Sequence, residues 1–122
     1  MIELSRVTKI YPGAVRPAVD SVSLTVPQGE ICVFIGPSGC GKTTLMRLIN
    51  RLIPLTSGSI SVDGKDIMTL NPIELRRHIG YVIQQVGLFP HMTVRDNIAT
   101  VPKLLGWTKA KIDERVDELL GL

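Results

Sequence analysis

Cysteines and runs of like charge are both scarce in this chain of 122 residues. The two cysteines, Cys32 and Cys40, do not have the spacing of a metal-binding motif. A disulfide between them would tie an apolar stretch to a glycine-rich one and close only a short loop, so we expect two reduced thiols, as in a cytosolic protein. Lysine and arginine number 14 but are dispersed, and the net charge is only +3, so we expect no nucleic-acid partner.

Long apolar runs and targeting segments are also lacking. No run approaches the ~20 apolar residues that cross a bilayer. The first residues carry no signal-peptide pattern, because residues 2–5 already alternate between apolar and polar side chains as a strand does. We therefore expect any association with a membrane to depend on a partner protein.

A glycine-rich stretch at residues 36–44 is the most specific motif. It fits the pattern G-x-x-x-x-G-K-[ST], the phosphate-binding P-loop, which lies between a strand and a helix. Residues 31–35 form the apolar run typical of a strand buried on both faces, and apolar residues recur at helical spacing over 45–52. The predicted phosphate-binding residues are Gly36, Pro37, Ser38, Gly39, Cys40, Gly41, Lys42, Thr43 and Thr44.

The residue types of this loop suit phosphate chemistry. Glycines permit left-handed backbone and close approach to a ligand, so successive N–H groups can surround phosphate oxygens at the positive end of the helix dipole. Lys42 would place its charge near the β- and γ-phosphates, and the Thr43 hydroxyl would ligate Mg²⁺. The alternative, an ordinary glycine-rich turn with a solvated lysine, leaves the flanking strand and helix patterns unexplained.

Several strands are predicted around the loop. Alternation indicates half-buried strands near residues 2–5, 21–26 and 59–63, and Asp63-Gly64 is a hairpin-type turn signal. A second apolar strand is expected over 81–83. Because buried apolar strands alternate with helices, the pattern predicts an α/β fold with a partly parallel sheet beside an antiparallel portion.

Three more helices are predicted from their caps and periodicity. Asn71, followed by proline, indicates a short helix that ends before Gly80, and Thr93 is a second cap. An apolar stripe over 112–120 predicts an amphipathic helix that ends at Gly121. We expect this stripe and Trp107 to belong to a core rather than to a site.

The order of these motifs resembles the nucleotide-binding domain of an ABC transporter. The resemblance rests on Tyr11, the P-loop, and the stretches at 80–85 and 88–94. It implies a P-loop NTPase (RecA-like) core with an antiparallel β subdomain over residues 1–88 and the start of a helical subdomain over 89–122. Residues 84–98 and 101–107 look most like importers of osmoprotectants such as glycine betaine, choline or carnitine.

The resemblance implies roles for single residues, with ATP and Mg²⁺ as the bound groups. Tyr11 matches the aromatic residue that stacks on adenine, whereas the residue alone reads equally well as a surface tyrosine at a strand end. Gln84 matches the glutamine that reaches Mg²⁺ or the attacking water, and its neighbour Gln85 is the rival for that role. Lys42 and Gln84 are therefore the expected catalytic residues, and Thr43 and Gln84 the expected Mg²⁺ ligands.

The resemblance also implies partners. Residues 89–91 match a segment that packs near the coupling helix of a membrane subunit, although His91 and His78 alone read as surface histidines. The implied partners are a second nucleotide-binding domain, transmembrane permease subunits and, indirectly, a substrate-binding protein. The implied location is the cytoplasmic face of the membrane.

Three motifs of that family are lacking: a signature close to L-S-G-G-Q, an apolar strand that ends in Asp-Glu, and a later switch histidine. Asp113-Glu114 lies in an amphipathic pattern, which indicates a solvated face. We therefore expect a truncated chain, the N-terminal part of such a domain, that is inactive as an ATPase alone. The alternatives are a nucleotide-binding module without turnover and a soluble ABC protein outside transport.

Overall fold

The computed structural model describes residues 1–83, 85 and 87–122 and divides into two compact units. The first unit spans Met1–Ile79 and the second spans Gly80–Leu122. The predicted boundary between residues 88 and 89 remains a prediction of the family resemblance.

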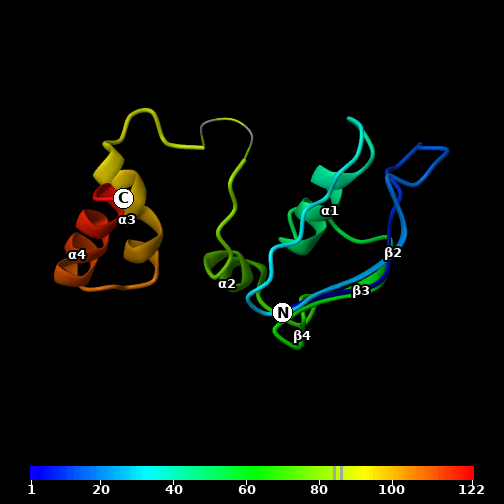
Figure 1. The fold of residues 1–122 in the computed structure, drawn as a ribbon, viewed down its shortest axis with the longest axis horizontal. Helices are drawn as coiled ribbons and strands as arrows, with labels where there is room; N and C mark the ends of the chain where they lie inside the picture. The colour runs from blue at the N-terminus through cyan, green and yellow to red at the C-terminus, as the bar shows by residue number, and fades with distance from the viewer. Residues whose placement is uncertain (84, 86) are drawn as a thin grey trace. The chain divides into compact units, whose positions relative to one another are not determined.

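The first unit is built on a four-stranded sheet (Figure 1). Its strands lie in the order β2-β1-β3-β4, and every neighbouring pair is antiparallel. The central strand β1 pairs with two segments from opposite sides of the P-loop in sequence, so the loop and its helix are inserted between strands of one sheet. The strands are β1 (Ile2–Lys9), β2 (Val19–Val26), β3 (Ser57–Val62) and β4 (Lys65–Asp66).

The predicted hairpin turn is confirmed between β3 and β4. Asp63 and Gly64 have φ angles of 50° and 75°, so both central residues of the two-residue turn are left-handed, as a tight hairpin requires. Aspartate is one of the few residues besides glycine that adopt this left-handed backbone. The Asp63 carboxylate accepts a hydrogen bond from the amino group of Met1 at 2.6 Å.

The helix after the P-loop, α1 (Lys42–Ile49), packs on one face of the sheet (Figure 1). It ends at Ile49, short of the predicted Leu52, because Arg51 takes a left-handed backbone with φ of 49°. The Asn50 side chain donates to the Met46 carbonyl at 2.9 Å and closes this end. The core it shares with the sheet consists of Leu4, Val7, Val19, Leu45, Leu48, Ile49, Ile60, Ile67 and Leu75.

Two predicted strands are wrong. Residues 31–35 and 81–83 have no strand structure, and Ile31 and Ile35 are each 92% exposed. A strand that is apolar on both faces is defined by neighbouring strands and by layers above and below it. Among the described residues no strand pairs with either segment, so the sheet has no parallel portion.

The helix predicted from the Asn71 cap is confirmed in detail. In α2 (Pro72–Arg77) the Asn71 side chain accepts from the backbone N–H groups of Ile73 and Glu74, and proline occupies the first helical position. His78 lies exposed at the C-terminal end of this helix, as predicted.

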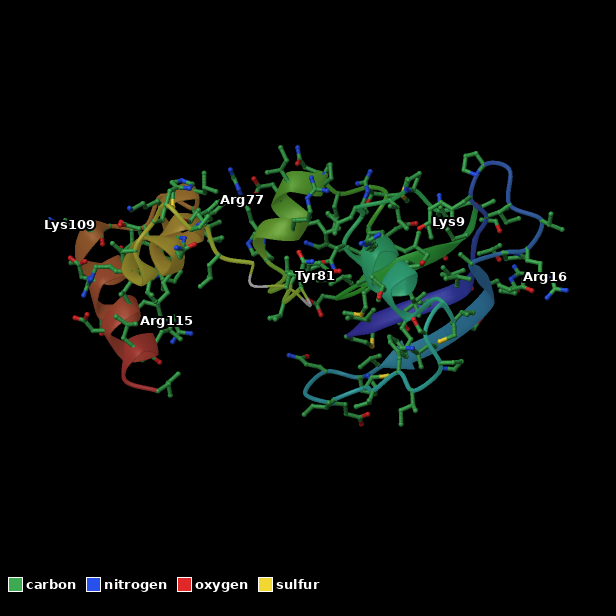
Figure 2. The ribbon with its side chains drawn as sticks, turned by 90° about the horizontal axis from the view of Figure 1, so that it is seen from above. Lys9, Arg16, Arg77, Tyr81, Lys109 and Arg115 are labelled. Carbon is green, nitrogen blue, oxygen red and sulfur yellow. The ribbon has the colours of Figure 1, made fainter. Side chains whose placement is uncertain are left out.

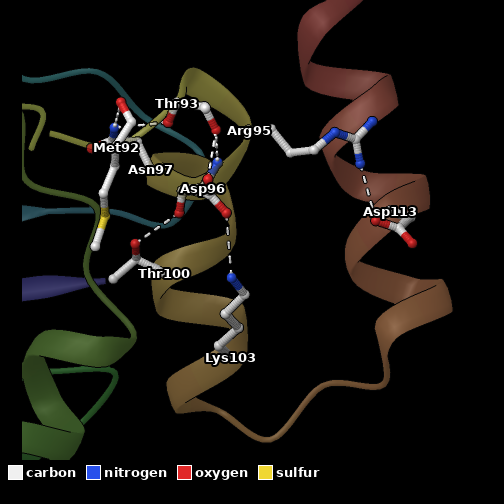
Figure 3. A network of polar contacts seen from close by, with 8 residues as sticks. All are labelled: Met92, Thr93, Arg95, Asp96, Asn97, Thr100, Lys103 and Asp113. Atoms are coloured by element: carbon white, nitrogen blue, oxygen red, sulfur yellow. Dashed lines mark hydrogen bonds and ion pairs between the residues drawn. The ribbon is translucent and has the colours of Figure 1, made fainter. Parts of the chain in front are cut away.

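The second unit holds a pair of helices, α3 (Val94–Leu104) and α4 (Lys109–Leu120), joined by a short turn. Ala99, Ile112 and Val116 are its buried residues, and Trp107 packs against them, which confirms the predicted core role. Arg95 on α3 binds Asp113 on α4 at 3.0 Å (Figure 3), so Asp113 lies on a half-exposed, ion-paired face.

The beginning of α3 is fixed by a reciprocal cap (Figure 3). The Thr93 hydroxyl accepts from the Asp96 backbone N–H at 3.1 Å and donates to the Asp96 carboxylate at 2.7 Å. The hydrogen bond from Thr93 is the main cause that holds the pKa of Asp96 below its ordinary value. The charges of Lys103 and Arg95 lower this pKa further, and desolvation opposes them.

We predict that the second unit loses stability in acid through Asp96. A carboxyl whose pKa is lowered by folding stabilises the folded state at every pH above its ordinary, unfolded pKa. This stabilisation is lost as the pH falls from the unfolded pKa through the folded pKa. The helical signal of the second unit should therefore weaken below about pH 4. Titration of the Asp96 carboxyl by NMR should show its pKa rising towards the ordinary value in Thr93→Ala.

Thr100→Ala is the matched control, because the Thr100 hydroxyl donates to the backbone carbonyl of Asp96 and not to its carboxylate. An Asp96 titration that is the same in both variants would contradict the assignment of the shift to Thr93.

Candidate functional site

The P-loop leads from residues 31–35, which form neither helix nor strand, into α1. Two of its three glycines have positive φ angles, 82° at Gly39 and 98° at Gly41. These are values that side chains other than glycine rarely adopt. The Cys40 backbone N–H donates to the Pro37 carbonyl at 3.4 Å, which closes a turn inside the loop.

Backbone crowding explains why glycine is needed at Gly41, where a Cβ would lie 2.3 Å from the carbonyl oxygen of Ala18. At Gly36 the nearest neighbour of a Cβ would be a side-chain atom, the Cys40 sulfur at 2.8 Å. The Ala18 N–H in turn donates to the Lys9 carbonyl at 2.8 Å. The loop therefore lies directly against the beginning of β2, which is hydrogen-bonded in turn to the end of β1.

The N-terminus of α1 is open to an anion. Gly41 is the N-cap, no side chain caps the helix, and its first turn contains no acidic residue. The first N–H groups of a helix have no intrahelical acceptors, and the helix dipole places partial positive charge at this end. This end of α1 fits a phosphate group.

Lys42 adds a full positive charge within the same loop. Its ammonium donates to the carbonyls of Gly36 at 2.6 Å and Pro37 at 2.9 Å and lies 3.4 Å from the Cys40 sulfur. The carbonyls hold the side chain across the loop instead of leaving it extended in solvent. Of the two threonines that follow, Thr43 is exposed and Thr44 is half-buried.

A groove of about 580 Å³ adjoins the loop. Its lining includes the P-loop residues Cys40, Gly41 and Lys42 and one acidic residue, Asp20. The other lining residues are apolar: Pro17, Ala18, Val19, Val22, Val33, Phe34, Ile35 and Leu45. The groove therefore brings residues of the anion-binding loop and apolar residues into one space.

Tyr11 follows β1 and begins the loop that returns to β2. Its carbonyl accepts the Ala14 N–H at 3.0 Å, and its side chain is 38% exposed. The hydrogen bond between Lys9 and Ala18 closes this loop at its base, and Ala18 contacts Gly41 of the P-loop. Tyr11 is therefore only two residues along the chain from a strand end that lies next to the P-loop. Figure 2 shows Lys9 at the base of this loop and Arg16 on it.

Of the two glutamines proposed for the Mg²⁺ or water contact, the structure describes only one. Gln84 lies outside the described residues, whereas Gln85 is exposed. In the part of the chain that is described, no group of three or more His, Cys, Asp and Glu side chains is arranged to hold a metal ion. The Thr43 hydroxyl fits Mg²⁺ only as one ligand beside phosphate oxygens and water, which is the usual arrangement for this ion.

Cys32 and Cys40 are both free, as predicted. Both are also exposed, whereas Cys32 was expected in a strand buried on both faces. Lys9 is the residue that sequence reasoning missed. It is 6% exposed, and a lysine at the end of an alternating strand reads as an outward-facing side chain. The signal that points to it is its spacing, two residues after the buried Val7 on the inward face of β1.

Comparison with protein families identifies the family of a chain with this loop and fold. The family model described as ABC transporter matches residues 19–121. The chain belongs to the ABC transporter family.

Two relatives within the ABC transporter family match the whole chain. The glycine betaine/carnitine/choline transport ATP-binding protein OpuCA of Bacillus subtilis is 57% identical over 122 residues. The osmoprotectant import ATP-binding protein OsmV of Salmonella typhimurium is 50% identical over 125 residues. The chain spans about a third of the length of these relatives, 32% and 33%.

Solved structures of ABC cassettes confirm the fold class. The post-hydrolysis dimer of the ATP-binding cassette MJ0796 bound to ADP and Pi matches 99% of this chain with a TM-score of 0.84 and 31% identity. The match covers 56% of that cassette. The predicted P-loop NTPase class, with its antiparallel β portion and its helices, is therefore correct, although the parallel strands expected at 31–35 and 81–83 are not formed.

No helix in the described parts of this ABC family member is long and apolar enough to cross a membrane.

We predict that Gly41→Ala and Gly39→Ala separate backbone strain from steric overlap. Both glycines are left-handed, so each alanine costs about 1–2 kcal/mol of folding free energy. A Cβ at Gly39 meets nothing within 4 Å, whereas one at Gly41 overlaps the Ala18 carbonyl. Gly41→Ala should cost a further ~1–3 kcal/mol for that overlap. Urea unfolding measures both values, and equal losses would contradict the close approach of the loop to Ala18.

Proposed function

We propose that this chain binds ATP through its P-loop. The observation that carries the proposal is the convergence of the uncapped N-terminus of α1, the left-handed glycines and the Lys42 ammonium on one exposed loop. Each of these features favours an anion, and together they match the charge of a polyphosphate. The cassette MJ0796, of similar fold, is described as bound to ADP and Pi.

The roles of the loop residues follow from their positions. The backbone N–H groups of the loop and of the first turn of α1 surround the phosphates. Lys42 exchanges its bonds to the Gly36 and Pro37 carbonyls for bonds to phosphate oxygens, which are stronger acceptors because they are charged. Thr43 supplies a hydroxyl to Mg²⁺, and the ion shields the charge of the phosphates.

Adenine lies on Tyr11 in this proposal, because the Tyr11 loop begins where the P-loop contacts Ala18. Stacking of a base on an aromatic ring contributes about 1–3 kcal/mol. Gln84, which aligns with the family's glutamine, is proposed to reach Mg²⁺ or the attacking water, with Gln85 as its rival.

The whole protein is proposed to be the ATPase subunit of an importer of an osmoprotectant such as glycine betaine, choline or carnitine. The support is the identity of 50–57% to transport ATP-binding proteins named for these substrates. Its partners would be a second copy of the domain, as in the dimeric cassettes of similar fold, and permease subunits in the membrane. It would therefore lie at the cytoplasmic face of the membrane, held by the permease.

A second candidate function, nucleotide binding without turnover, is favoured for these 122 residues alone. Hydrolysis needs a carboxylate that activates water and groups that stabilise the transferring phosphate. The acidic pair Asp113-Glu114 lies on α4, where Asp113 binds Arg95. Asp113 therefore acts as an ion-pair partner.

We predict that binding of a fluorescent ATP analogue with Mg²⁺ depends on Lys42 and Tyr11. Lys42→Ala removes the charge at the phosphates, and Tyr11→Ala removes the stacking surface, so each should weaken binding about tenfold or more. Lys65→Ala is the control, since Lys65 is an exposed lysine on β4. If all three variants bind the analogue as tightly as the unsubstituted chain does, the proposed site is overturned.

We also predict that the 122-residue chain binds ATP without appreciable turnover. Phosphate release under saturating Mg·ATP should equal the release from Lys42→Ala. Turnover at typical enzyme rates of about 1–100 s⁻¹ that Lys42→Ala abolishes would show that the chain holds its own catalytic carboxylate.

A further inference from the structure

Lys9 is the most buried charged side chain among the described residues, and it has no role in the proposed site. Only 6% of it is exposed, and its ammonium donates one hydrogen bond, to the Pro54 carbonyl at 2.7 Å. An ammonium has three donors, and burying it costs free energy unless further partners compensate. The second partner is the aromatic ring of Tyr11, whose centroid lies 5.2 Å from the Lys9 nitrogen.

This distance and burial fit a cation–π contact. A cation within about 6 Å of a ring centroid is attracted by the π electrons of the ring face, and the attraction grows as the cation loses water. Lys9 is almost fully buried whereas Tyr11 is 38% exposed. The contact therefore covers one side of the ring from within the protein and leaves the ring partly open to solvent.

The surroundings of Lys9 hold it in place. Strand β1 ends at Lys9, which pairs with the buried Val19 at the start of β2. On the other side, the Thr56 N–H donates to the Thr8 carbonyl at 3.0 Å and the Ile10 N–H donates to the Thr56 hydroxyl at 2.9 Å. Hydrogen bonds on both sides of Lys9 therefore fix the point from which its side chain reaches Pro54 and Tyr11.

We propose that Lys9 is a positioning residue for base recognition: it holds the Tyr11 ring so that the ring's free side receives adenine. The inference rests on the proposed function, because it takes Tyr11 as the adenine-stacking residue. A ring held on one side loses less conformational freedom when a base binds to the other. The cation also draws electron density from the ring and favours stacking with an electron-rich purine.

The experiment compares binding of ATP with binding of inorganic triphosphate, which has the phosphates but no base. Lys9→Met removes the charge and keeps a long apolar side chain. ATP affinity should fall about threefold to tenfold, whereas triphosphate affinity, measured by competition, should stay within about twofold. Lys9→Arg keeps a cation over the ring and should restore ATP affinity. Lys65→Met, on the exposed β4, is the control for loss of a lysine.

A double-substituted chain, Lys9→Met with Tyr11→Ala, tests whether Lys9 acts through the ring. It should bind ATP no more weakly than Tyr11→Ala alone. The ring proton resonances of Tyr11 in the nucleotide-free chain should shift in Lys9→Met and return in Lys9→Arg, which tests positioning without any ligand.

The outcomes separate this inference from the proposed function. Equal loss of ATP and triphosphate binding in Lys9→Met, or unchanged Tyr11 resonances, overturns the positioning role while the ATP site stands. Loss of ATP binding in Tyr11→Ala with no effect of Lys9→Met also overturns the positioning role alone. ATP binding that neither Tyr11→Ala nor Lys42→Ala weakens overturns the proposed function itself.

Discussion

The contact between Gly41 and the carbonyl of Ala18 is the constraint on which the site depends. No side chain fits between these two backbones, and Ala18 is itself hydrogen-bonded to Lys9. The P-loop, the start of α1, the end of β1 and the start of β2 are therefore fixed to one another by main-chain atoms. Main-chain contacts have no rotamers to sample, so the loop and the Tyr11 segment keep their relative position without any side chain mediating between them.

The charges of the loop are arranged before any ligand arrives. Lys42 is held across the loop by two carbonyls, and the helix N-terminus beside it is uncapped. A ligand with several negative oxygens replaces these carbonyls without ordering a free lysine first, which lowers the entropic cost of binding. Lys9, whose backbone carbonyl binds Ala18, is arranged in the same way, because a carbonyl and a ring hold its ammonium.

The features that were predictable from sequence are those that a few adjacent residues determine. The Asp63-Gly64 turn and the Asn71 and Thr93 caps need only local backbone geometry and short polar side chains, and all three are present. The strands expected at 31–35 and 81–83 are absent because such strands depend on neighbours elsewhere in a sheet.

The candidate site shows the same division between local and distant determinants. The P-loop could be located by its pattern, but its contact with Ala18 joins segments that the sequence keeps far apart. Lys9 was missed because its environment comes from Pro54 and Tyr11, and a strand pattern does not show which lysine a distant carbonyl will hold. Its burial depends on tertiary structure that composition and spacing do not encode.

The insertion of the P-loop helix between strands of one sheet has a consequence for how the first unit forms. Ile2 on β1 pairs with Val62 on β3, so the central strand cannot complete its hydrogen bonds until a segment about sixty residues later is available. Contacts between residues this distant in sequence close slowly, because the entropy of the intervening chain is lost before the pairing repays it. During synthesis the glycine loop and α1 therefore leave the ribosome before the sheet that will support them is complete.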